Sequence, residues 1–374
     1  MEKDKSIDPR RLTPAASLNR VRFVEVPGLP LPAEMLGRTA YHLLAARSVA
    51  ELAQQEMGVA GVNPPPDILL QLHRALADSS MPLATVAQRV AERVGMRLGW
   101  LVVTLRRGDP ASRDARPDWD DSYWRHWAGI STIYLGGGIA SGRLGPHIAR
   151  QANAVLEAAG MEACAVQISH WPQQLSLVGG ARLIPALPEV SAAAVLDFGQ
   201  SIVKRGCARY EDRTLASLQL LPPVSARWTV FPPGVEQTAE DVARLGEFMA
   251  TTLAETWQAV HSADGGTVPG IVASFASYLR DGQPLARQGG PYASLLRLSD
   301  NLEDWLSRRV SEITRRALTV SLLHDGTAAA TTYAGEQSAA VIMLGTALGY
   351  GFPPDSRATT PLAPHFTVAS AEGA

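Results

Sequence analysis

The amino-acid sequence predicts an α/β fold with two domains. Short apolar segments typical of buried strands alternate with longer stretches in which apolar residues recur at helical spacing, and this alternation indicates sheets covered by helices. Three of the apolar segments run into glycine-rich turns, at Gly136, Gly199 and Gly345. The length of 374 residues is enough for about two domains, each with its own hydrophobic core.

The bulk composition excludes several functional classes. The chain is 46% hydrophobic and 19% charged with a formal net charge of −2, which predicts neither a basic surface for nucleic acid nor a membrane-spanning run. Its two cysteines, Cys164 and Cys207, lack the spacing of a metal site and fit a reduced cytoplasm. The charged N-terminus lacks the apolar core of a signal peptide. We expect a cytoplasmic protein whose partner is a small-molecule substrate rather than nucleic acid or membrane, with homodimer formation left open.

The first half of the chain predicts a domain rich in helices. The expected strands are 20–26, 131–135 and 163–168, and the expected helices are 33–57, 67–77, 83–105, 144–159 and 175–184. The last of these helices contains Gly179 and Gly180, which suit close packing against a neighbour. Trp119, Trp124 and Trp127 follow the long helix, and packing beneath a loop is favoured over a ligand site for them.

The second half predicts a further α/β domain after a linker at 185–191. The expected strands are 193–198, the hairpin partner that carries Lys204, 227–231, 270–273, 318–323, 339–344 and 365–368, and the expected helices are 238–260, 300–316 and one that starts at Ala328. A flexible loop is expected at 282–290, where glycines and polar residues cluster.

The stretch from Ala194 to Arg205 has the pattern of a phosphate-binding hairpin. A strand runs into Asp197, Gly199 permits a tight turn, and a second strand carries Lys204. Backbone amides and a hydroxyl at such a turn can donate to a phosphate, and an acid there suits a metal ion. An ordinary hairpin with a surface lysine has the same pattern, so the motif alone leaves both interpretations open.

A second group of polar residues follows the apolar segment 318–323. Asp325 stands at this strand end, where it could act as a general base or cap the following helix. His324 precedes it and could contact a substrate or serve the fold. Asn301 has the same two alternatives, substrate contact or helix cap.

Together the glycine turns resemble those of the actin, sugar-kinase and chaperone ATPase superfamily. The first phosphate hairpin of that superfamily, Asp-x-Gly-x-(Ser/Thr/Gly), is similar to residues 197–201. Its second phosphate hairpin is similar to Gly345-Thr346-x-x-Gly349-x-Gly351, and its adenosine motif to residues 135–140. The resemblance implies a two-lobed actin-like ATPase fold, which is ribonuclease H-like.

Within the superfamily, the sequence is similar to the ROK sugar kinases. Segments typical of that family resemble His324–Ala330, Ile133–Ile139, Leu177–Ala181 and Asn301–Trp305. The His/Cys zinc cluster of the family and its Gly-His segment, which presents sugar-binding residues, are absent from the sequence. The nucleotide half of the resemblance is therefore the stronger one.

The resemblance implies bound ATP and Mg²⁺ and assigns roles to the motifs. Asp197 would hold Mg²⁺ through water, and Asp325 would be the catalytic base. Asn301 and His324 would contact the substrate. The residues implied in binding the cofactor are Asp197, Gly199, Gln200, Ser201, Lys204, Gly345 and Thr346 at the phosphates, and Gly136, Gly137 and Gly138 at the adenosine.

The motifs stand in a different order from that of the family. The adenosine motif precedes both phosphate hairpins here, which predicts a circular permutation. One lobe would comprise 1–188 completed by 326–374, and the other 189–325 with the first phosphate hairpin and Asp325. The permutation requires strands near residues 20, 342 and 366 to share one sheet.

Two function classes remain open on the sequence. The first is ATP-dependent phosphoryl transfer to a hydroxyl of a small molecule, a sugar or sugar-like acceptor, with Asp325 as base. The second is a non-catalytic or regulatory nucleotide-binding protein of the same fold. Retention of Asp197, Lys204 and Asp325 favours the enzyme, and loss of the sugar-binding segment favours the alternative.

Overall fold

The computed structural model describes residues 12–58, 67–78, 80–185, 192–229, 237–264, 267–285 and 291–370. They belong to two compact units, each discontinuous in sequence. Within the described residues, unit 1 is formed by Ala15–Gln173 and Ser338–Gly351, and unit 2 by 12–14, 352–370 and the described part of Gln174–Gln337. Residues 174–185, 326–337 and 352–370, which the sequence-based division assigned to the other lobe, are thus in unit 2 with the Asp197 hairpin. The expected linker 185–191 lies almost wholly outside the described residues.

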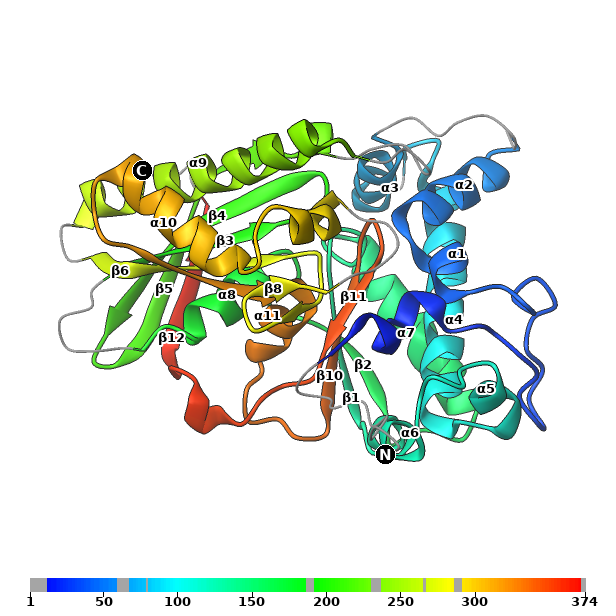
Figure 1. The fold of residues 1–374 in the computed structure, drawn as a ribbon. Coiled ribbons are helices and arrows are strands. Elements are labelled where there is room, and N and C mark those ends of the chain that lie inside the picture. Colours follow the sequence, from blue (N-terminus) through cyan, green and yellow to red (C-terminus); the bar gives the residue numbers. More distant parts are fainter. Residues whose placement is uncertain are drawn as a thin grey trace, which may run out of the picture. The chain divides into compact units, whose positions relative to one another are not determined.

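Unit 2 contains, among the described residues, a six-stranded sheet of order β12-β5-β4-β3-β6-β9 (Figure 1). Its strands are β3 (Ala192–Phe198), β4 (Ile202–Glu211), β5 (Thr214–Ser225), β6 (Thr267–Phe275), β9 (Thr319–His324) and β12 (Leu362–Ala369). Strands β3, β4 and β5 form an antiparallel meander, and β6 and β9 continue the sheet parallel to β3. This order and these directions are those of the ribonuclease H-like fold, which confirms the predicted fold class. A two-stranded ribbon, β7 (Leu279–Arg280) with β8 (Gln283–Pro284), follows β6.

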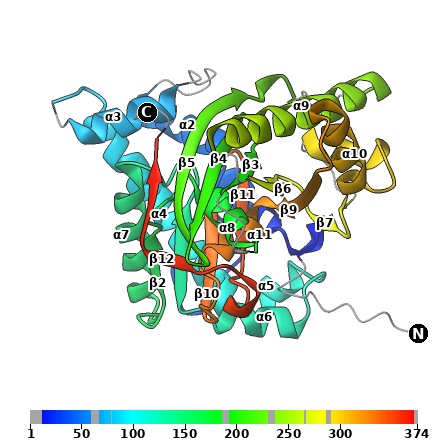
Figure 2. The ribbon, with the colours of Figure 1, turned by 90° about the vertical axis from the view of Figure 1, so that its left-hand side faces the viewer.

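Helices cover both faces of this sheet. Figures 1 and 2 show α9 (Ala239–Asp264) and α10 (Leu302–Thr314) over one face, and α8 (Leu175–Arg182) and α11 (Asp325–Thr331) over the other. Because side chains alternate along a strand, Ala194, Leu196 and Phe198 of β3 join the hydrophobic core beneath α9 and α10. The residues between them, Asp197 included, therefore belong to the face of α8 and α11.

Helices α8 and α11 approach each other closely because α8 carries a glycine at their contact. A Cβ atom placed on Gly179 would lie 1.7 Å from the backbone oxygen of Ala328, a distance that no side chain can occupy. The prediction that this small-residue helix packs closely against a neighbour is confirmed.

Unit 1 has a four-stranded sheet of order β11-β10-β1-β2 within the described residues. Strands β1 (Thr132–Gly136), β2 (Ala165–Ile168) and β10 (Ala339–Leu344) are parallel, and β11 (Leu348–Gly351) pairs antiparallel with β10. The helices of this unit are α1 (Ala40–Leu44), α2 (Ala46–Glu56), α3 (Ile68–Ala77), α4 (Ala84–Arg107), α5 (Pro110–Asp114), α6 (Asp121–Ala128) and α7 (Leu144–Ala158). Gly95 and Gly99 of α4 allow its close contact with α7, since a Cβ on Gly95 would lie 2.5 Å from the Ile148 oxygen.

Two expected elements of unit 1 differ in the structure. The expected strand 20–26 is wrong: Leu18–Arg20 is a 3₁₀ turn, and Arg22 makes only an isolated bridge with Thr39. The expected helix 33–57 begins only at Ala40 and is divided at Ala45, whose extended backbone separates α1 from α2. In the sequence, Arg47 interrupts the apolar stripe two residues after this break.

The sheet arrangement expected from a circular permutation is also wrong. Strand β12, near residue 366, pairs with β5 in the sheet of unit 2, whereas β10, near residue 342, is in the sheet of unit 1. The segment near residue 20 reaches β11 through a side chain: the Asn19 amide donates to the Leu348 oxygen and accepts from the Leu348 nitrogen at 2.8 and 2.9 Å. The predicted circular permutation is therefore not supported, because the strands that it requires in one sheet lie in different sheets or are not formed.

The three tryptophans after α4 are packing residues in the structure. Trp119, Trp124 and Trp127 are each exposed by 5% or less, and the Trp119 ring contacts the rings of Tyr123 and Trp124 with centroids 4.7 and 4.9 Å away. This agrees with the favoured prediction of packing over a ligand site. None of the helices in the described parts of the chain has the length and apolar character needed to cross a membrane.

Candidate functional site

Three adjacent parallel strands of unit 2 place polar residues near their carboxyl ends. Asp197 of β3 is paired in register with Ser274 of β6, and Ser274 is paired with Leu323 of β9, which Asp325 follows by two residues. Carboxyl ends of neighbouring parallel strands are where α/β folds bind ligands. The structure thus brings Asp197 and Asp325, which lie far apart in sequence, to one edge of a single sheet.

The Asp197 carboxylate is buried and held by two side chains. It is 6% exposed; Oδ1 accepts a hydrogen bond of 2.9 Å from the Ser274 hydroxyl, and Oδ2 lies 3.1 Å from the Lys204 ammonium. The β3–β4 register places Lys204 directly opposite Asp197. Ser274 was missed by the sequence analysis, because a serine inside an apolar strand gives no signal until its neighbour is known.

Lys204 is the more accessible member of this pair. Its side chain is 34% exposed, whereas that of Asp197 is 8% exposed. A compact ammonium beside a buried carboxylate keeps water-facing donors that an anion can contact. The predicted hairpin with Lys204 on its second strand is confirmed, and the role of Lys204 toward a phosphate stays a prediction.

The turn after β3 is held by its own backbone and by a buried tyrosine. The Gly199 nitrogen donates to the oxygens of Asp197 and Ile202, both at 3.1 Å, and the Tyr292 hydroxyl donates to the Gly199 oxygen at 2.9 Å. Burial, and secondly the negative charge of Asp197, raise the pKa of Tyr292 far above its ordinary value, so this phenol remains a donor. Gln200 is half-buried and Ser201 exposed at the tip.

Asp325 begins α11 directly after β9. The His324 Nδ1 accepts from the Thr327 nitrogen at 3.3 Å and so caps the helix. Because Nδ1 accepts this hydrogen bond, it carries no proton. In a neutral imidazole the proton is then on Nε2. That nitrogen lies 3.2 Å from Asp325 Oδ1, which also accepts from the Gly326 nitrogen at 2.7 Å.

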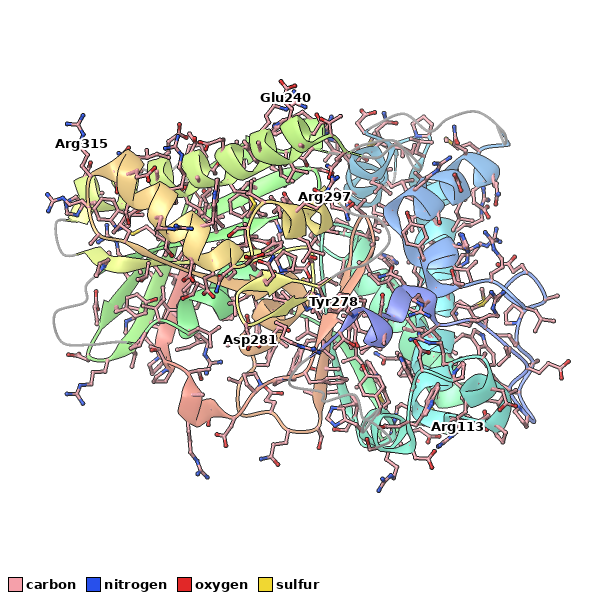
Figure 3. The ribbon with its side chains drawn as sticks, viewed as in Figure 1. Arg113, Glu240, Tyr278, Asp281, Arg297 and Arg315 are labelled. Atoms are coloured by element: carbon pink, nitrogen blue, oxygen red, sulfur yellow. The ribbon has the colours of Figure 1, made fainter. Side chains whose placement is uncertain are left out.

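This geometry bears on the two roles that the sequence left open for Asp325. His324 provides the N-cap through its own side chain, while Asp325 accepts from one N–H of the first turn, so its role as a base stays a prediction. Tyr278, labelled in Figure 3, stacks on the His324 ring with centroids 4.3 Å apart and planes 17° apart. His324 is 8% exposed and the Asp325 side chain is 22% exposed. The imidazole is therefore fixed in place beside a partly accessible carboxylate.

Asn301 caps a helix in the structure. Its side-chain oxygen accepts a hydrogen bond of 3.0 Å from the Asp304 nitrogen at the start of α10. This was one of the two alternatives for Asn301, and the other, substrate contact, stays a prediction.

In unit 1, the glycine motifs lie against each other. Gly137 has φ +88°, and a Cβ on it would lie 2.3 Å from the Leu344 oxygen at the end of β10, one residue before Gly345. The Ile139 nitrogen donates to the same Leu344 oxygen at 3.1 Å. The adenosine motif and the second phosphate motif are thus neighbours, and Gly138 has open space where a side chain would be.

Residues outside the motifs support this glycine loop. The Ser141 hydroxyl donates to the Gly138 oxygen at 2.7 Å and accepts from the Gln173 amide at 2.8 Å. His73 of α3 contacts the loop as well: burial lowers its pKa, while a hydrogen bond with the Gly138 backbone acts in the opposite direction. Thr346 is exposed beyond the end of β10. Nothing in the sequence around His73 indicated its place beside this loop.

The donors near Asp197 fit a hard cation that keeps most of its water. No group of three His, Cys, Asp or Glu side chains gathers as a metal cage among the described residues. Mg²⁺ is usually bound through one or two carboxylates, with water and phosphate oxygens completing its shell. A single buried carboxylate flanked by a hydroxyl agrees with that donor set and not with a zinc or calcium cage.

Comparison with known proteins adds little to the structure. No protein-family model and no curated protein matches the sequence. The Aquifex aeolicus Ppx/GppA phosphatase, type II variant, is 14% identical over 36% of this chain and 36% of its own, with a TM-score of 0.20. An exopolyphosphatase-like protein is 9% identical over 71% of this chain and 87% of its own, with a TM-score of 0.27. The chain covers about a third of the first of these structures, and similarity at these levels carries no argument. The ROK resemblance has no support here, and the fold assignment rests on the strand order.

Proposed function

We propose that this protein transfers a phosphoryl group from ATP to a hydroxyl of a small, sugar-like molecule. The observation that carries the proposal is the placement of Asp197, Ser274 and Asp325 at the ends of three adjacent parallel strands. Phosphoryl transfer requires positioned anion donors, a site for a divalent cation and a base for the acceptor hydroxyl. Unit 2 offers a candidate for each of these requirements within one sheet edge.

The hairpin is proposed to bind the phosphates. Lys204 is the cation of the turn, and Gln200 and Ser201 present amides and a hydroxyl at its tip. When bound, Mg²⁺ held by Asp197 would neutralise charge on the phosphates. The Ser274 and Lys204 contacts keep the Asp197 carboxylate oriented without help from a ligand, and such preorganisation avoids a reorganisation cost on binding.

Asp325 is proposed to accept the proton of the acceptor hydroxyl. The His324 Nε2–H and the Gly326 N–H both reach Oδ1, which orients the carboxyl group and directs Oδ2 to the acceptor. Stacking on Tyr278 and the Thr327 contact keep His324 in the tautomer that donates. His324 is thus a positioning residue in this proposal.

The glycine motifs of unit 1 remain candidates for nucleotide binding by backbone amides. Gly136, Gly137 and Gly138 form the turn proposed for adenosine, and Gly345 and Thr346 the turn proposed for phosphate. The mutual contact of these turns through Leu344 supports a common role.

The test measures ADP formation with Mg²⁺ and ATP across a panel of sugars and polyols. Wild type is compared with Asp325→Asn and with Asp212→Asn, a control in the exposed β4–β5 turn, where the left-handed backbone (φ +46°) suits asparagine. Turnover that depends on an acceptor and is lost only in Asp325→Asn supports the proposal. ATP binding without turnover on any acceptor supports the regulatory alternative, and absence of nucleotide binding overturns both.

A further inference from the structure

An open pocket in unit 1 is lined by none of the residues of the glycine motifs and takes no part in the proposed chemistry. It has a volume of about 520 Å³, within the range of small-molecule sites. Its lining residues are Asn19, Arg20, Arg22, Thr39, Tyr41, Ala115, Arg116, Pro117 and Asp118. They come from the N-terminal segment, the start of α1 and the loop between α5 and α6.

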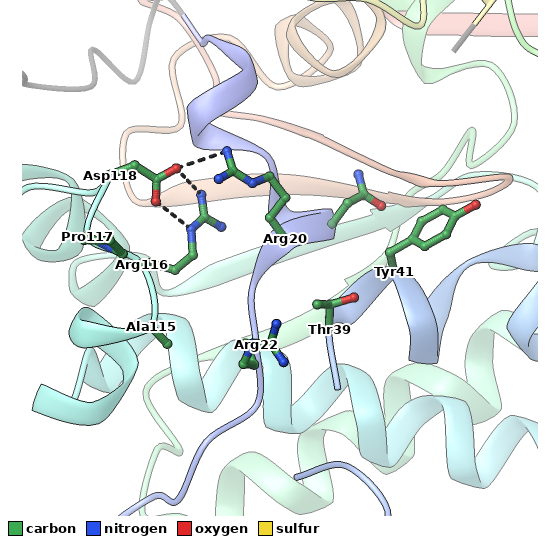
Figure 4. Close-up of a pocket in the computed structure, with 9 residues that line it drawn as sticks. Arg20, Arg22, Thr39, Tyr41, Ala115, Arg116, Pro117 and Asp118 are labelled. Carbon is green, nitrogen blue, oxygen red and sulfur yellow. Dashed lines mark hydrogen bonds and ion pairs between the residues drawn. The ribbon is translucent and has the colours of Figure 1, made fainter. Parts of the chain in front are cut away.

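The charges in this pocket are unbalanced. Figure 4 shows the Asp118 carboxylate facing the guanidinium groups of Arg20 and Arg116, at 3.1 and 3.0 Å. The third guanidinium, that of Arg22, donates to the Gly37 oxygen at 2.5 Å and forms no ion pair with a described residue. Three guanidinium groups and one carboxylate leave two positive charges to be matched.

The pocket has one fixed arginine and two accessible ones. Arg116 is 3% exposed, donates to the oxygens of Ser17 and Ala15, and lies over the Trp119 ring at 4.2 Å. The Arg20 side chain is 60% exposed and Arg22 is also exposed. Arg116 therefore holds the wall and orients Asp118, while Arg20 and Arg22 can turn toward a ligand.

Tyr41 lies across the pocket from the loop that carries Arg116 and Asp118 (Figure 4). It is 42% exposed, and an exposed aromatic ring offers a stacking face for a planar or ring-shaped group. Ala115 and Pro117 add small apolar surfaces on the side of the loop. The pocket thus combines a cationic side with an aromatic ring across from it.

We propose that this pocket binds a small phosphomonoester whose organic part rests on Tyr41. A phosphomonoester carries about −1.5 to −2 charges at neutral pH, which matches the two unbalanced positive charges. Guanidinium groups bind such oxyanions in pairs of parallel hydrogen bonds. The site belongs to unit 1 alone and does not depend on the activity proposed for unit 2.

The test is calorimetric titration of the full-length protein with phenyl phosphate, inorganic phosphate and benzoate. We expect phenyl phosphate to bind more tightly than either of the others, and less tightly as salt rises, because exposed charges are screened. The double variant Arg20→Ala/Arg22→Ala should weaken phenyl phosphate binding at least about tenfold, because it removes two charged donors to the phosphate. Tyr41→Ala should weaken phenyl phosphate binding and leave inorganic phosphate binding unchanged.

Matched controls separate this site from the one proposed in unit 2. Arg47→Ala/Arg89→Ala removes two exposed arginines of the same unit that do not line the pocket and should bind phenyl phosphate as wild type does. Asp325→Asn should also leave this binding unchanged. Absence of phenyl phosphate binding in wild type, or equal binding by the pocket and control double variants, overturns the proposal. Either result leaves the ATP turnover experiment on unit 2 unaffected.

Discussion

The sheets of the two units share a design but differ in what their strand ends carry. In each, a strand forms an antiparallel hairpin on one side and parallel pairings on the other: β3 with β4 and β6, and β10 with β11 and β1. The strand ends of unit 2 carry the charged residues Asp197 and Asp325. Those of unit 1 run into Gly136 and Gly345. The two sheets therefore differ in the groups that they present at their strand ends: charged side chains in unit 2 and backbone groups of glycine turns in unit 1.

The chain also passes through the two sheets in different orders. In unit 2 the hairpin comes first and the parallel strands β6 and β9 follow. In unit 1 the parallel strands β1 and β2 come first, and the hairpin β10–β11 follows after more than one hundred and fifty residues. Both sheets form, so an antiparallel hairpin can either precede or follow the parallel strands in the chain.

The largest effect is expected where side-chain chemistry is removed from unit 2. Asp325→Asn should lower kcat about 100- to 10,000-fold, the usual contribution of a general base, with little change in the KM for ATP. Steady-state kinetics with the acceptor found in the panel would check this. His324→Gln should lower kcat less and shift its pH profile, as a positioning residue would. Equal activity of Asp325→Asn and wild type would remove the base from the mechanism.

Two adjacent glycines of unit 1 allow a test of its glycine turn. Gly137→Ala should destabilise the protein by about 3 kcal/mol, because its backbone is left-handed and the new methyl would meet the Leu344 oxygen. Gly138→Ala is the matched control, since nothing lies within 4 Å of its Cβ position. Urea unfolding measures both free energies. Similar losses in the two variants would show that the turn is not held as the structure indicates.

Patterns within short segments predicted the fold well, but they could not predict the contacts of the site between residues far apart in the sequence. The glycine turns, the hairpin that carries Asp197 and Lys204, and the close packing at Gly179 all follow from patterns within short segments. The Ser274 contact could not be predicted, because it depends on the register of two strands 77 residues apart. Arg182 is similar: it is buried and donates to backbone oxygens far away in sequence.

The prediction of a strand at 20–26 was wrong for a related reason. The β-branched pattern of 20–26 favours a strand, but pairing needs an edge that accepts it. At the edge strand β11, the Asn19 side chain already satisfies both backbone groups of Leu348. A local pattern cannot show that a side chain replaces a strand.

The role of the Asn19 side chain at the edge of β11 can be tested directly. Asn19→Ala should cost about 2 kcal/mol of unfolding free energy, because the Leu348 N–H and C=O both lose their partner. Chemical denaturation would measure the loss, and hydrogen exchange at the Leu348 amide would locate it. A variant as stable as wild type, with unchanged exchange at Leu348, would mean that water replaces the Asn19 contacts without cost.

A smaller effect is expected at the helix cap of unit 2. Asn301→Ala should reduce stability by about 1 kcal/mol, the usual cost of losing an N-cap, whereas Asn301→Asp keeps an acceptor for the Asp304 nitrogen and should be nearly neutral. Thermal unfolding checks the pair. A large rise in acceptor KM in both variants would instead assign Asn301 to the substrate, the alternative that the sequence left open.

The smallest expected effect is on the pH dependence of stability, where one carboxylate in each unit is compared. In unit 2, burial raises the pKa of Glu303 above its model-compound value of 4.5. The folded state therefore holds this proton more tightly than the unfolded state, and the contribution of Glu303 to stability falls as pH rises from 4.5 through its folded pKa. In unit 1, the hydrogen bond from Arg93 lowers the pKa of Glu56, so its contribution is present above 4.5 and is lost as pH falls through its folded pKa.

Two glutamine variants should reveal these opposite signs. Relative to wild type, Glu303→Gln should become more stable as pH rises from 4 to 7, because the variant has no charge to desolvate and can still accept from the Leu322 nitrogen. Glu56→Gln should become less stable over the same range, because it loses a charge that arginines stabilise. Urea unfolding of the full chain at closely spaced pH values measures both trends. The same sign of pH dependence in both variants would contradict this prediction, since a half-buried carboxylate with a raised pKa and an arginine-paired one with a lowered pKa respond to pH with opposite signs.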